Sequence, residues 1–327
     1  MIFLQSQNAV FVTVIKHKTM KQTYIFLLVV IAFITSIWAC GGKEKGDTAL
    51  QDSIARADSM ALKVGVLPTL DCLPLYIAAE EGIFDSIGVD VRLVNYDNSF
   101  DSDNAIMTGT IDGGVTDCVR AQWMKARGCA VKPVSVTNTY WQFITNSKAR
   151  ISKFSQMTDK MIAMTRFSAT AMMADMAVDS SGIDDIFIFL IQINNPQTRL
   201  RMIQNNEMDA AVMAEPQATT ARSAGHPVLM DSRDRRLQLG CIVFSEKILA
   251  DERKQEQVER FLRAYDAAVE EINKHGVKAY SDIITSRMNT DDETVSQLPD
   301  IVFDKHTAPS DSIMSVVAAW LDKEKKK

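Results

Sequence analysis

The sequence predicts an α/β protein with two doubly wound, Rossmann-like lobes and a ligand cleft between them. Short apolar runs alternate with segments of helical spacing, and this alternation restarts once along the chain. A length of 327 residues suits two lobes of ordinary size better than one small domain. With 46% hydrophobic and 24% charged residues, the composition is that of a globular protein, which excludes disordered and multi-pass membrane proteins.

The first 39 residues predict a secretory signal peptide. Three lysines precede the apolar run Tyr24–Ala39, and no Asp or Glu occurs before Glu44. The run is short for a membrane span and ends directly before Cys40. This junction resembles a bacterial lipoprotein signal, which implies cleavage before Cys40 and a diacylglycerol on its sulfur. An uncleaved single-span anchor is the alternative, and either Met1 or Met20 can be the start.

Residues 40–62 are expected to form a flexible tether, because they are polar and charged with few large apolar side chains. The C-terminal boundary of the tether has an alternative, since Ile54, Met60 and Leu62 could begin a short helix. The protein is therefore expected in the cell envelope, lipid-anchored to a membrane and facing the periplasm or the exterior. The sequence does not indicate which membrane holds the lipid.

The charge of the chain limits its partners. The formal net charge is -5, and removal of the signal peptide would leave 33 basic and 41 acidic residues. An acidic excess argues against nucleic acid, which needs clustered Lys and Arg. Anionic headgroups would repel the mature chain, so membrane contact is expected through the N-terminal lipid only.

The first set of alternating elements begins at Lys63. Asp71 is expected to cap the first helix, and Gly82 to end it. Strands are expected at residues 64–67, 89–94, 112–116 and 131–136, and further helices at 102–107 and 119–127. Short apolar strands alternating with helices at this spacing predict a parallel sheet.

The second set begins near Phe154. Ser168 is expected to cap its first helix, and residues 186–193 are apolar enough for a central strand. Strands are expected at 160–164, 186–193, 209–213 and 228–229, and helices at 169–179, 199–206 and 218–224. Residues 107–115 and 204–212 share one pattern, in which a helix ends in a polar turn and Asp begins a strand of small residues. Two such copies indicate two lobes of equivalent topology rather than a solenoid.

The C-terminal part is mostly helical after an apolar segment at 239–244. Helices are expected at 252–273, 279–288, 293–298 and 312–321. The last one is amphipathic through Val316, Val317, Trp320 and Leu321, so it should dock on a lobe.

Three groups of segments carry a resemblance to a known family. They are residues 64–68, 75–84 and 88–91, then residues 207–216, and finally residues 244–246 and 261–265. In this order they resemble periplasmic type II solute-binding proteins of ABC transporters. The subgroup is the NMT1/THI5-like group, which handles sulfonates, taurine, nitrate and thiamine-pyrimidine compounds.

The resemblance implies two lobes joined by two crossovers, with lobe 1 at residues 63–140 plus 239–327 and lobe 2 at 141–238. It also implies that the protein captures a small organic molecule and delivers it to an ABC permease and ATPase complex. No cofactor, metal or catalytic residue is expected. A ligand should lie where the carboxyl ends of strands and the helix N-termini converge.

Ten residues in loops that follow strands are the candidate ligand-binding residues. They are Thr69, Asp71, Asp117, Asn138, Tyr140, Trp141, Arg166, Ser168, Thr170 and Glu215. Arg166 could clamp a carboxylate or sulfonate. The three acids favour an organic ligand with an amine or a hydrogen-bonding ring, such as a pyrimidine stacked on an aromatic side chain. Each Asp or Ser could equally be a plain helix cap, and the aromatic rings could be packing residues.

Two other functions remain as alternatives. One is an enzyme of the same fold that acts on a pyrimidine-type precursor, and the other is a sensor lipoprotein without a transported ligand. The mature chain has no common catalytic motif, and none of His226, His275 and His306 lies beside Cys or an acid. Cys72 and Cys118 could form a disulfide or a reactive pair, although buried thiols are the favoured interpretation.

Overall fold

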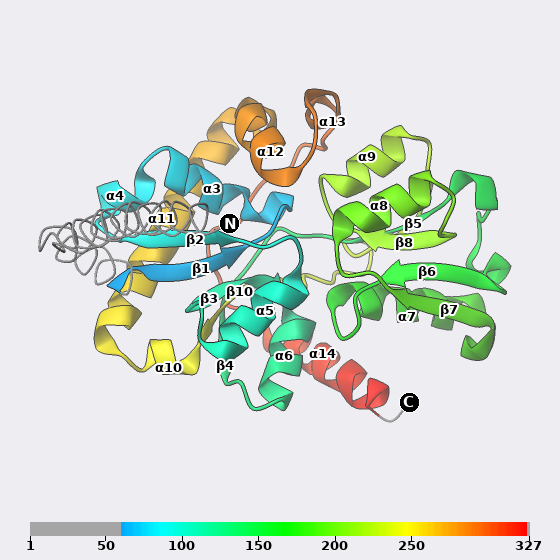
Figure 1. Ribbon diagram of the computed structural model, residues 1–327, viewed down its shortest axis with the longest axis horizontal. Coiled ribbons are helices and arrows are strands. Elements are labelled where there is room, and N and C mark those ends of the chain that lie inside the picture. The colour runs from blue at the N-terminus through cyan, green and yellow to red at the C-terminus, as the bar shows by residue number, and fades with distance from the viewer. Residues whose placement is uncertain (1–59, 326–327) are drawn as a thin grey trace, which may run out of the picture. The chain divides into compact units, whose positions relative to one another are not determined.

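The computed structural model describes residues 60–325 and has an α/β fold with two mixed five-stranded sheets. Figure 1 shows the two sheets side by side, each with its own helices. The predicted fold class is confirmed. The predicted signal peptide, Cys40 and most of the predicted tether lie outside the described residues. Within residues 60–325, no helix has the length and apolar character needed to cross a membrane.

Lobe 1 is built on the first sheet, in the strand order β2-β1-β3-β10-β4. Its strands are β1 (Leu62–Val66), β2 (Val91–Asn95), β3 (Gly113–Asp117), β4 (Val131–Val136) and β10 (Gly240–Ser245). Strand β1 is parallel to β2 and β3, whereas β10 is antiparallel to β3 and β4. The four strands expected in this lobe therefore run in one direction, and β10, which was not expected as a strand, lies between β3 and β4 in the opposite direction because it returns from the other lobe. Leu62 begins β1. The segment before residue 60, in which a short helix was considered, lies outside the described residues.

The helices of lobe 1 cover this sheet and pack through a large apolar core. They are α3 (Leu73–Glu80), α4 (Ile83–Ile87), α5 (Ser99–Thr108), α6 (Cys118–Ala126), α10 (Glu246–Leu249), α11 (Glu252–His275), α12 (Ser281–Met288), α13 (Asp292–Ser296) and α14 (Asp311–Glu324). The long helix α11 turns Phe261 inward, where its ring stacks on Phe84 and meets Phe244 edge-on. This core fixes α3 and therefore the loop between β1 and α3.

Lobe 2 is built on the second sheet, in the order β7-β6-β8-β5-β9. Its strands are β5 (Gln142–Thr145), β6 (Lys160–Met164), β7 (Ile188–Gln192), β8 (Ala210–Met213) and β9 (Val228–Asp231), and its helices are α7 (Ala169–Ser181), α8 (Pro196–Gln204) and α9 (Gln217–Ser223). Strand β6 is parallel to β7 and β8, and β5 is antiparallel to β8 and β9. Strand β5 was not expected from the sequence. The expected central position of β7 is wrong, since β7 is an edge strand with Phe189 47% exposed.

Two chain segments, residues 137–141 and 232–239, connect the sheets. They lie side by side, because the Ser232 N–H donates to the Trp141 carbonyl oxygen at 2.9 Å at one end, and the Thr137 N–H donates to the Gly240 carbonyl oxygen at 2.9 Å at the other. A Cβ atom on Gly240 would lie 2.2 Å from Thr137 Oγ1, so only glycine allows this close approach. Short 3-10 turns complete the fold at Leu70–Cys72, Ser147–Ala149, Phe154–Gln156, Asp185–Phe187 and Val277–Tyr280.

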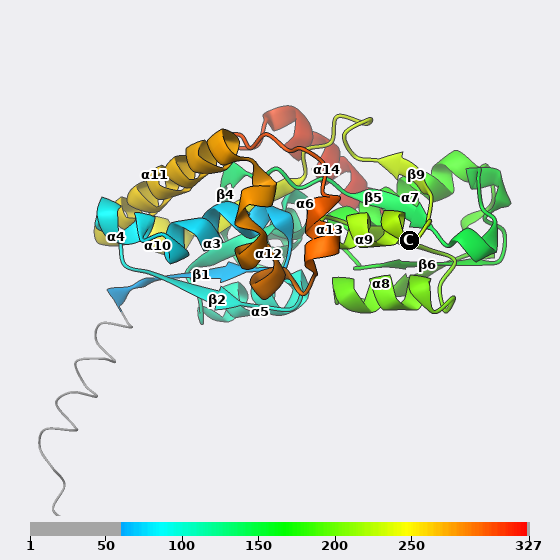
Figure 2. The ribbon, with the colours of Figure 1, turned by 90° about the horizontal axis from the view of Figure 1, so that it is seen from above.

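The two lobes contact each other directly (Figure 2). The Leu70 N–H donates to the Glu215 carbonyl oxygen at 2.9 Å, and Gln217 Nε2 donates to the Pro68 carbonyl oxygen at 3.2 Å. Helix α14 packs on α6 of lobe 1 and also reaches α7 of lobe 2, where Trp320 Nε1 donates to Asp175 Oδ2 at 3.0 Å. The structure is therefore a closed arrangement of the lobes.

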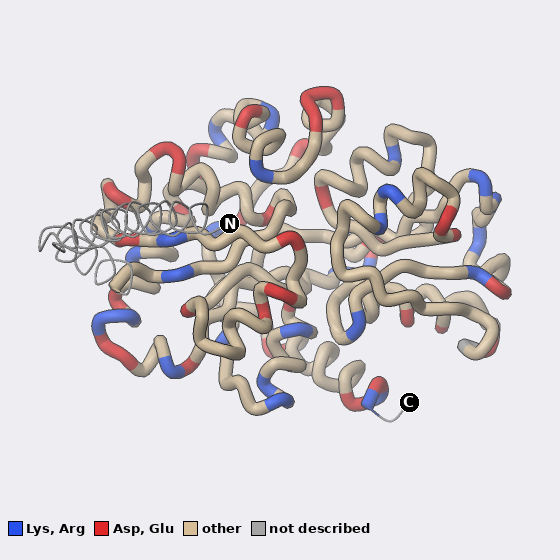
Figure 3. Tube along the Cα trace, in the orientation of Figure 1, with Lys and Arg blue, Asp and Glu red and all other residues tan. Residues whose placement is uncertain are grey.

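Acidic and basic residues are interspersed along the chain of both lobes (Figure 3). Most of the ion pairs join exposed or half-buried groups, such as Arg260 with Glu256 and Lys305 with Glu270. Such surface pairs add little stability.

Candidate functional site: a cavity between the lobes

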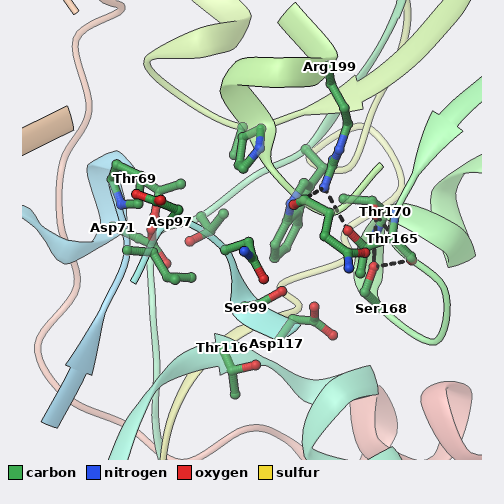
Figure 4. A pocket seen from close by; sticks show the side chains of 18 residues that line it. Thr69, Asp71, Asp97, Ser99, Thr116, Asp117, Thr165, Ser168, Thr170 and Arg199 are labelled. Carbon is green, nitrogen blue, oxygen red and sulfur yellow. Dashed lines mark hydrogen bonds between the residues drawn. The ribbon is translucent and has the colours of Figure 1, made fainter. Parts of the chain in front are cut away.

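A cavity of about 60 Å³ lies between the two lobes (Figure 4). The carboxyl ends of β1, β2 and β3 and the residues that follow them line it from lobe 1, and those of β6, β7 and β8 line it from lobe 2. The first connecting segment adds Thr139 and Trp141. This is the edge at which parallel strands end, which is where open α/β sheets bind ligands.

Six of the ten predicted residues line this cavity. They are Thr69, Asp71, Asp117, Trp141, Ser168 and Thr170. They come from both lobes and from the first connecting segment, so a molecule held here would contact the two lobes at once.

The other four predicted residues do not line the cavity. Asn138, Tyr140 and Glu215 surround a smaller neighbouring space of about 10 Å³. The Tyr140 hydroxyl donates to Glu215 Oε1 at 3.2 Å, and the same carboxylate pairs with Arg222 at 2.8 Å. The polar groups of Tyr140 and Glu215 therefore hold α9 against the connecting segment. Arg166 is exposed and lines a separate hollow.

Asp71 is not the helix cap that the sequence indicated. Helix α3 begins at Leu73, and its N-cap position is Cys72, which makes no side-chain cap bond. Asp71 lies instead in the preceding 3-10 turn and is 6% exposed. Its Oδ2 atom accepts a hydrogen bond from Thr137 Oγ1 at 3.0 Å, whereas its Oδ1 atom is buried without a partner. Burial, and next the charge of Asp71, raise the pKa of the Cys72 thiol.

Asp117 has two structural roles at the cavity wall. It caps α6, because Oδ1 accepts a hydrogen bond from the Arg120 N–H at 2.9 Å. Burial raises the pKa of its carboxyl group to about 7, although hydrogen bonds from the N–H groups of Arg120 and Ala169 oppose that rise. Since Ala169 begins α7, this carboxyl group connects the two lobes. Arg120 also crosses between them, donating from Nη1 to the Arg166 carbonyl oxygen at 3.3 Å.

The loop between β6 and α7 is a tight hydroxyl-rich turn. Ser168 caps α7 by accepting from the Thr170 N–H at 3.1 Å, as the sequence indicated. The Ser168 hydroxyl also lies 2.7 Å from the Thr165 carbonyl oxygen, and Thr170 Oγ1 accepts from the Thr165 N–H at 2.8 Å. Phe167 adopts φ 52°, in the left-handed region, and its ring stacks on Trp123 of lobe 1.

Sequence reasoning missed Arg199, which is buried at the lobe 2 wall of the cavity (Figure 4). Its guanidinium donates to the Ile193 carbonyl oxygen at 2.8 Å, the Val212 carbonyl oxygen at 2.5 Å and Thr165 Oγ1 at 2.8 Å. Burial lowers its pKa to about 10. Arg199 therefore ties together the carboxyl ends of β6, β7 and β8.

Asp97, Ser99 and Asn194 also line the cavity and were not selected from the sequence. They follow β2 and β7, so applying the same rule to every strand end would have found them. The four cysteines of the described chain, Cys72, Cys118, Cys129 and Cys241, are free thiols. The structure therefore contains no bridge between Cys72 and Cys118.

Comparisons with known proteins agree with this geometry. The sequence profile described as NMT1/THI5 like matches residues 69–279. That range contains both connecting segments and every residue of the cavity wall except Leu67 and Pro68. No protein with a curated description matches the sequence.

Solved structures of periplasmic binding proteins share the fold. The alkanesulfonate-binding protein SsuA of Xanthomonas axonopodis pv. citri, bound to MOPS, superposes with a TM-score of 0.68 at 13% identity, covering 80% of this chain and 91% of that one. The aliphatic sulphonate binding protein SsuA of Escherichia coli gives 0.67 at 14% identity, with 81% and 88% covered. The nitrate-binding protein NrtA of Synechocystis PCC 6803 gives 0.63 at 14% identity, with 72% and 68% covered. The fold is therefore that of the type II periplasmic binding proteins.

Proposed function

Because the chain belongs to the NMT1/THI5-like family, we propose that it is a solute-binding protein of an ABC import system. It holds a small organic molecule between its lobes and passes it unaltered to a permease and its ATPase. The observation that supports this proposal is the cavity itself, whose wall comes from strand-end loops of both lobes. Clefts of this kind at domain interfaces are the usual sites of small-molecule binding.

Ligand capture follows from the two-lobed construction. A molecule that contacts both walls favours the closed arrangement by its differential affinity for it. Asp71 and Trp141 contribute from lobe 1 and the connection, and Ser168 and Thr170 contribute from lobe 2. Hydroxyl groups can both donate and accept, so this wall suits a polar organic molecule.

Equilibrium dialysis with mass spectrometry tests the proposal. The full-length protein, purified in a mild detergent, is dialysed against a small-molecule extract of the cells that produce it. We expect one compound to be enriched on the protein side at a stoichiometry near one and to be released unchanged on denaturation. Recovery of a converted product would favour the enzyme alternative. The absence of any enriched compound would contradict solute binding.

The proposed location is the cell envelope, with Cys40 as the lipidated residue. Cys40→Ser should move the protein from the membrane fraction to the soluble fraction and abolish labelling by a radioactive fatty acid. Cys129→Ser is the matched control, because it removes a cysteine from the described body and leaves Cys40 intact. Retention of Cys40→Ser in the membrane fraction would favour the uncleaved anchor.

A further inference from the structure

The cavity differs from the rest of the molecule in how its buried carboxylates are neutralised. Six Asp and Glu side chains are buried within residues 60–325. Four of them form ion pairs, namely Asp103 with Arg120, Asp175 with Lys323, Glu215 with Arg222 and Asp231 with Arg233. The two that form no ion pair in this part of the chain are Asp71 and Asp117, and both line the cavity.

The cavity wall offers little positive charge to an anion. Arg199 is the only Lys or Arg among its lining residues in the described chain. Its guanidinium already donates to three main-chain carbonyl oxygens and to Thr165 Oγ1. It therefore holds the loops of lobe 2, whereas a third carboxylate, Asp97, stands exposed among the lining residues.

An unpaired buried carboxylate is costly unless something neutralises it. Asp71 is the clearer case, because its Oδ1 atom is buried, has no hydrogen-bond partner and belongs to a cavity-lining side chain. Trp141 supplies an aromatic ring to the same wall, and such rings attract cations. We propose that the ligand is a compact organic cation, such as a protonated or quaternary amine, with Asp71 as its principal counter-charge.

This inference rests on the proposed function and narrows its ligand class. The cavity volume of about 60 Å³ limits the charged group to a few heavy atoms, since about 10–15 Å³ in this measure holds one water. The hydroxyl of Tyr265 is also buried without a hydrogen-bond partner. Burial, and next the charge of Asp71, raise the pKa of Tyr265, so the two groups interact. A water molecule shared by these two groups would satisfy Asp71 without any ligand, and the experiment separates this case.

The test divides a small-molecule extract by charge. The extract is separated on ion-exchange resins into cationic, neutral and anionic fractions, and each is added to the full-length protein in a thermal unfolding assay. We expect the cationic fraction alone to raise the unfolding temperature. Stabilisation by the anionic or neutral fraction instead would overturn the proposal. If no fraction stabilises the protein, the proposed function fails together with the inference.

The variant Asp71→Asn then tests whether Asp71 is the counter-charge of the bound cation. Asparagine has the shape of aspartate and can still accept from Thr137 Oγ1, so the variant should fold. It should need at least tenfold more of the cationic fraction for the same stabilisation. Asp85→Asn, an exposed carboxylate on α4, is the matched control and should bind as the original protein does. Unchanged binding by Asp71→Asn would show that Asp71 is satisfied by water. The thermal unfolding test with the three fractions uses the original protein, so it does not depend on whether Asp71→Asn folds.

Discussion

The protonation of Asp117 should give the stability of the protein a distinct pH dependence. The pKa of this carboxyl group is about 7 in the folded protein and about 3.9 in an unfolded chain. Between these values the folded state retains a proton that the unfolded state has lost. The contribution of Asp117 to the free energy of unfolding is therefore largest at acidic pH and falls as the pH rises through 7. The charged groups that act on it are Arg120 on α6 and Asp103 on α5.

Asp117→Asn removes this titration and keeps a cap on α6. We expect the loss of unfolding free energy between pH 5 and pH 8 to be smaller in the variant by about 2–3 kcal/mol. Urea unfolding at the two pH values measures this difference. Asp97→Asn is the control, since Asp97 is exposed. Equal pH dependence in Asp117→Asn and the original protein would contradict the elevated pKa.

Arg199 should contribute to stability through its hydrogen bonds to buried main-chain groups at the cavity wall. Replacing it by Ala leaves the carbonyl groups of Ile193 and Val212 without their donor in a buried setting. We expect the free energy of unfolding to fall by about 3 kcal/mol, because removal of one partner exposes the full desolvation cost of the others. Arg201→Ala on the same helix is the matched control, since Arg201 is exposed and makes one hydrogen bond. A loss below about 1 kcal/mol would contradict the role assigned to Arg199.

Among the helices, α14 contacts both lobes. Its apolar face, including Val317 and Leu321, belongs to the same core cluster as residues of both lobes. At its C-terminal end, Trp320 Nε1 and Lys323 Nζ both approach Asp175 on α7. The sequence showed that this helix is amphipathic but not that it would reach the second lobe, because the partner of an apolar face is a tertiary property.

Trp320→Phe tests the contact between α14 and α7. The change keeps an aromatic ring in the core and removes the indole N–H that donates to Asp175. We expect a loss of about 1.5–3 kcal/mol in the free energy of unfolding, as for a hydrogen bond to a charged group. Val316→Ala, at a more exposed position of the same helix, should cost less than 0.5 kcal/mol. Equal effects of the two changes would show that the indole N–H contributes nothing.

Elements set by local sequence signals could be predicted, whereas features set by contacts between distant parts of the chain could not. Strand β6 matched its expected span because apolar runs and flanking turns are local signals. The edge position of β7 and the antiparallel direction of β10 were missed, because pairing partners come from distant parts of the chain. Strand β5 was missed as well, and its partners β8 and β9 likewise come from a distant part of the chain.

The cavity residues show the same difference between local signals and tertiary contacts. Asp117 and Ser168 were found because a strand followed by a helix cap is visible in the sequence, and strand ends converge in this class of fold. Arg199 was missed because the direction of a helical side chain depends on how the helix docks. Arg166 illustrates the converse, since it lies in a suitable loop and yet is exposed outside the cavity wall.

At the scale of the whole molecule, the two lobes are joined beside the cavity by two direct hydrogen bonds. Beside the cavity, the Leu70 N–H meets the Glu215 carbonyl oxygen and Gln217 Nε2 meets the Pro68 carbonyl oxygen. Only the second of these bonds involves a side chain, so a substitution can remove it selectively. Gln217 is buried at the first turn of α9, on the opposite lobe from Pro68.

Gln217→Ala should therefore shift the lobes toward an open arrangement. Loss of one neutral hydrogen bond of about 1 kcal/mol changes the ratio of open to closed protein by about fivefold. Small-angle X-ray scattering of the variant should show a larger radius of gyration without ligand, and saturation by the enriched compound should restore the value of the original protein. The apparent affinity should fall by up to the same factor, because only the closed form holds the ligand. Gln204→Ala, an exposed glutamine on α8 of the same lobe, is the control. A Gln217→Ala protein with unchanged scattering and weakened binding would indicate that Gln217 acts on the ligand site rather than on closure.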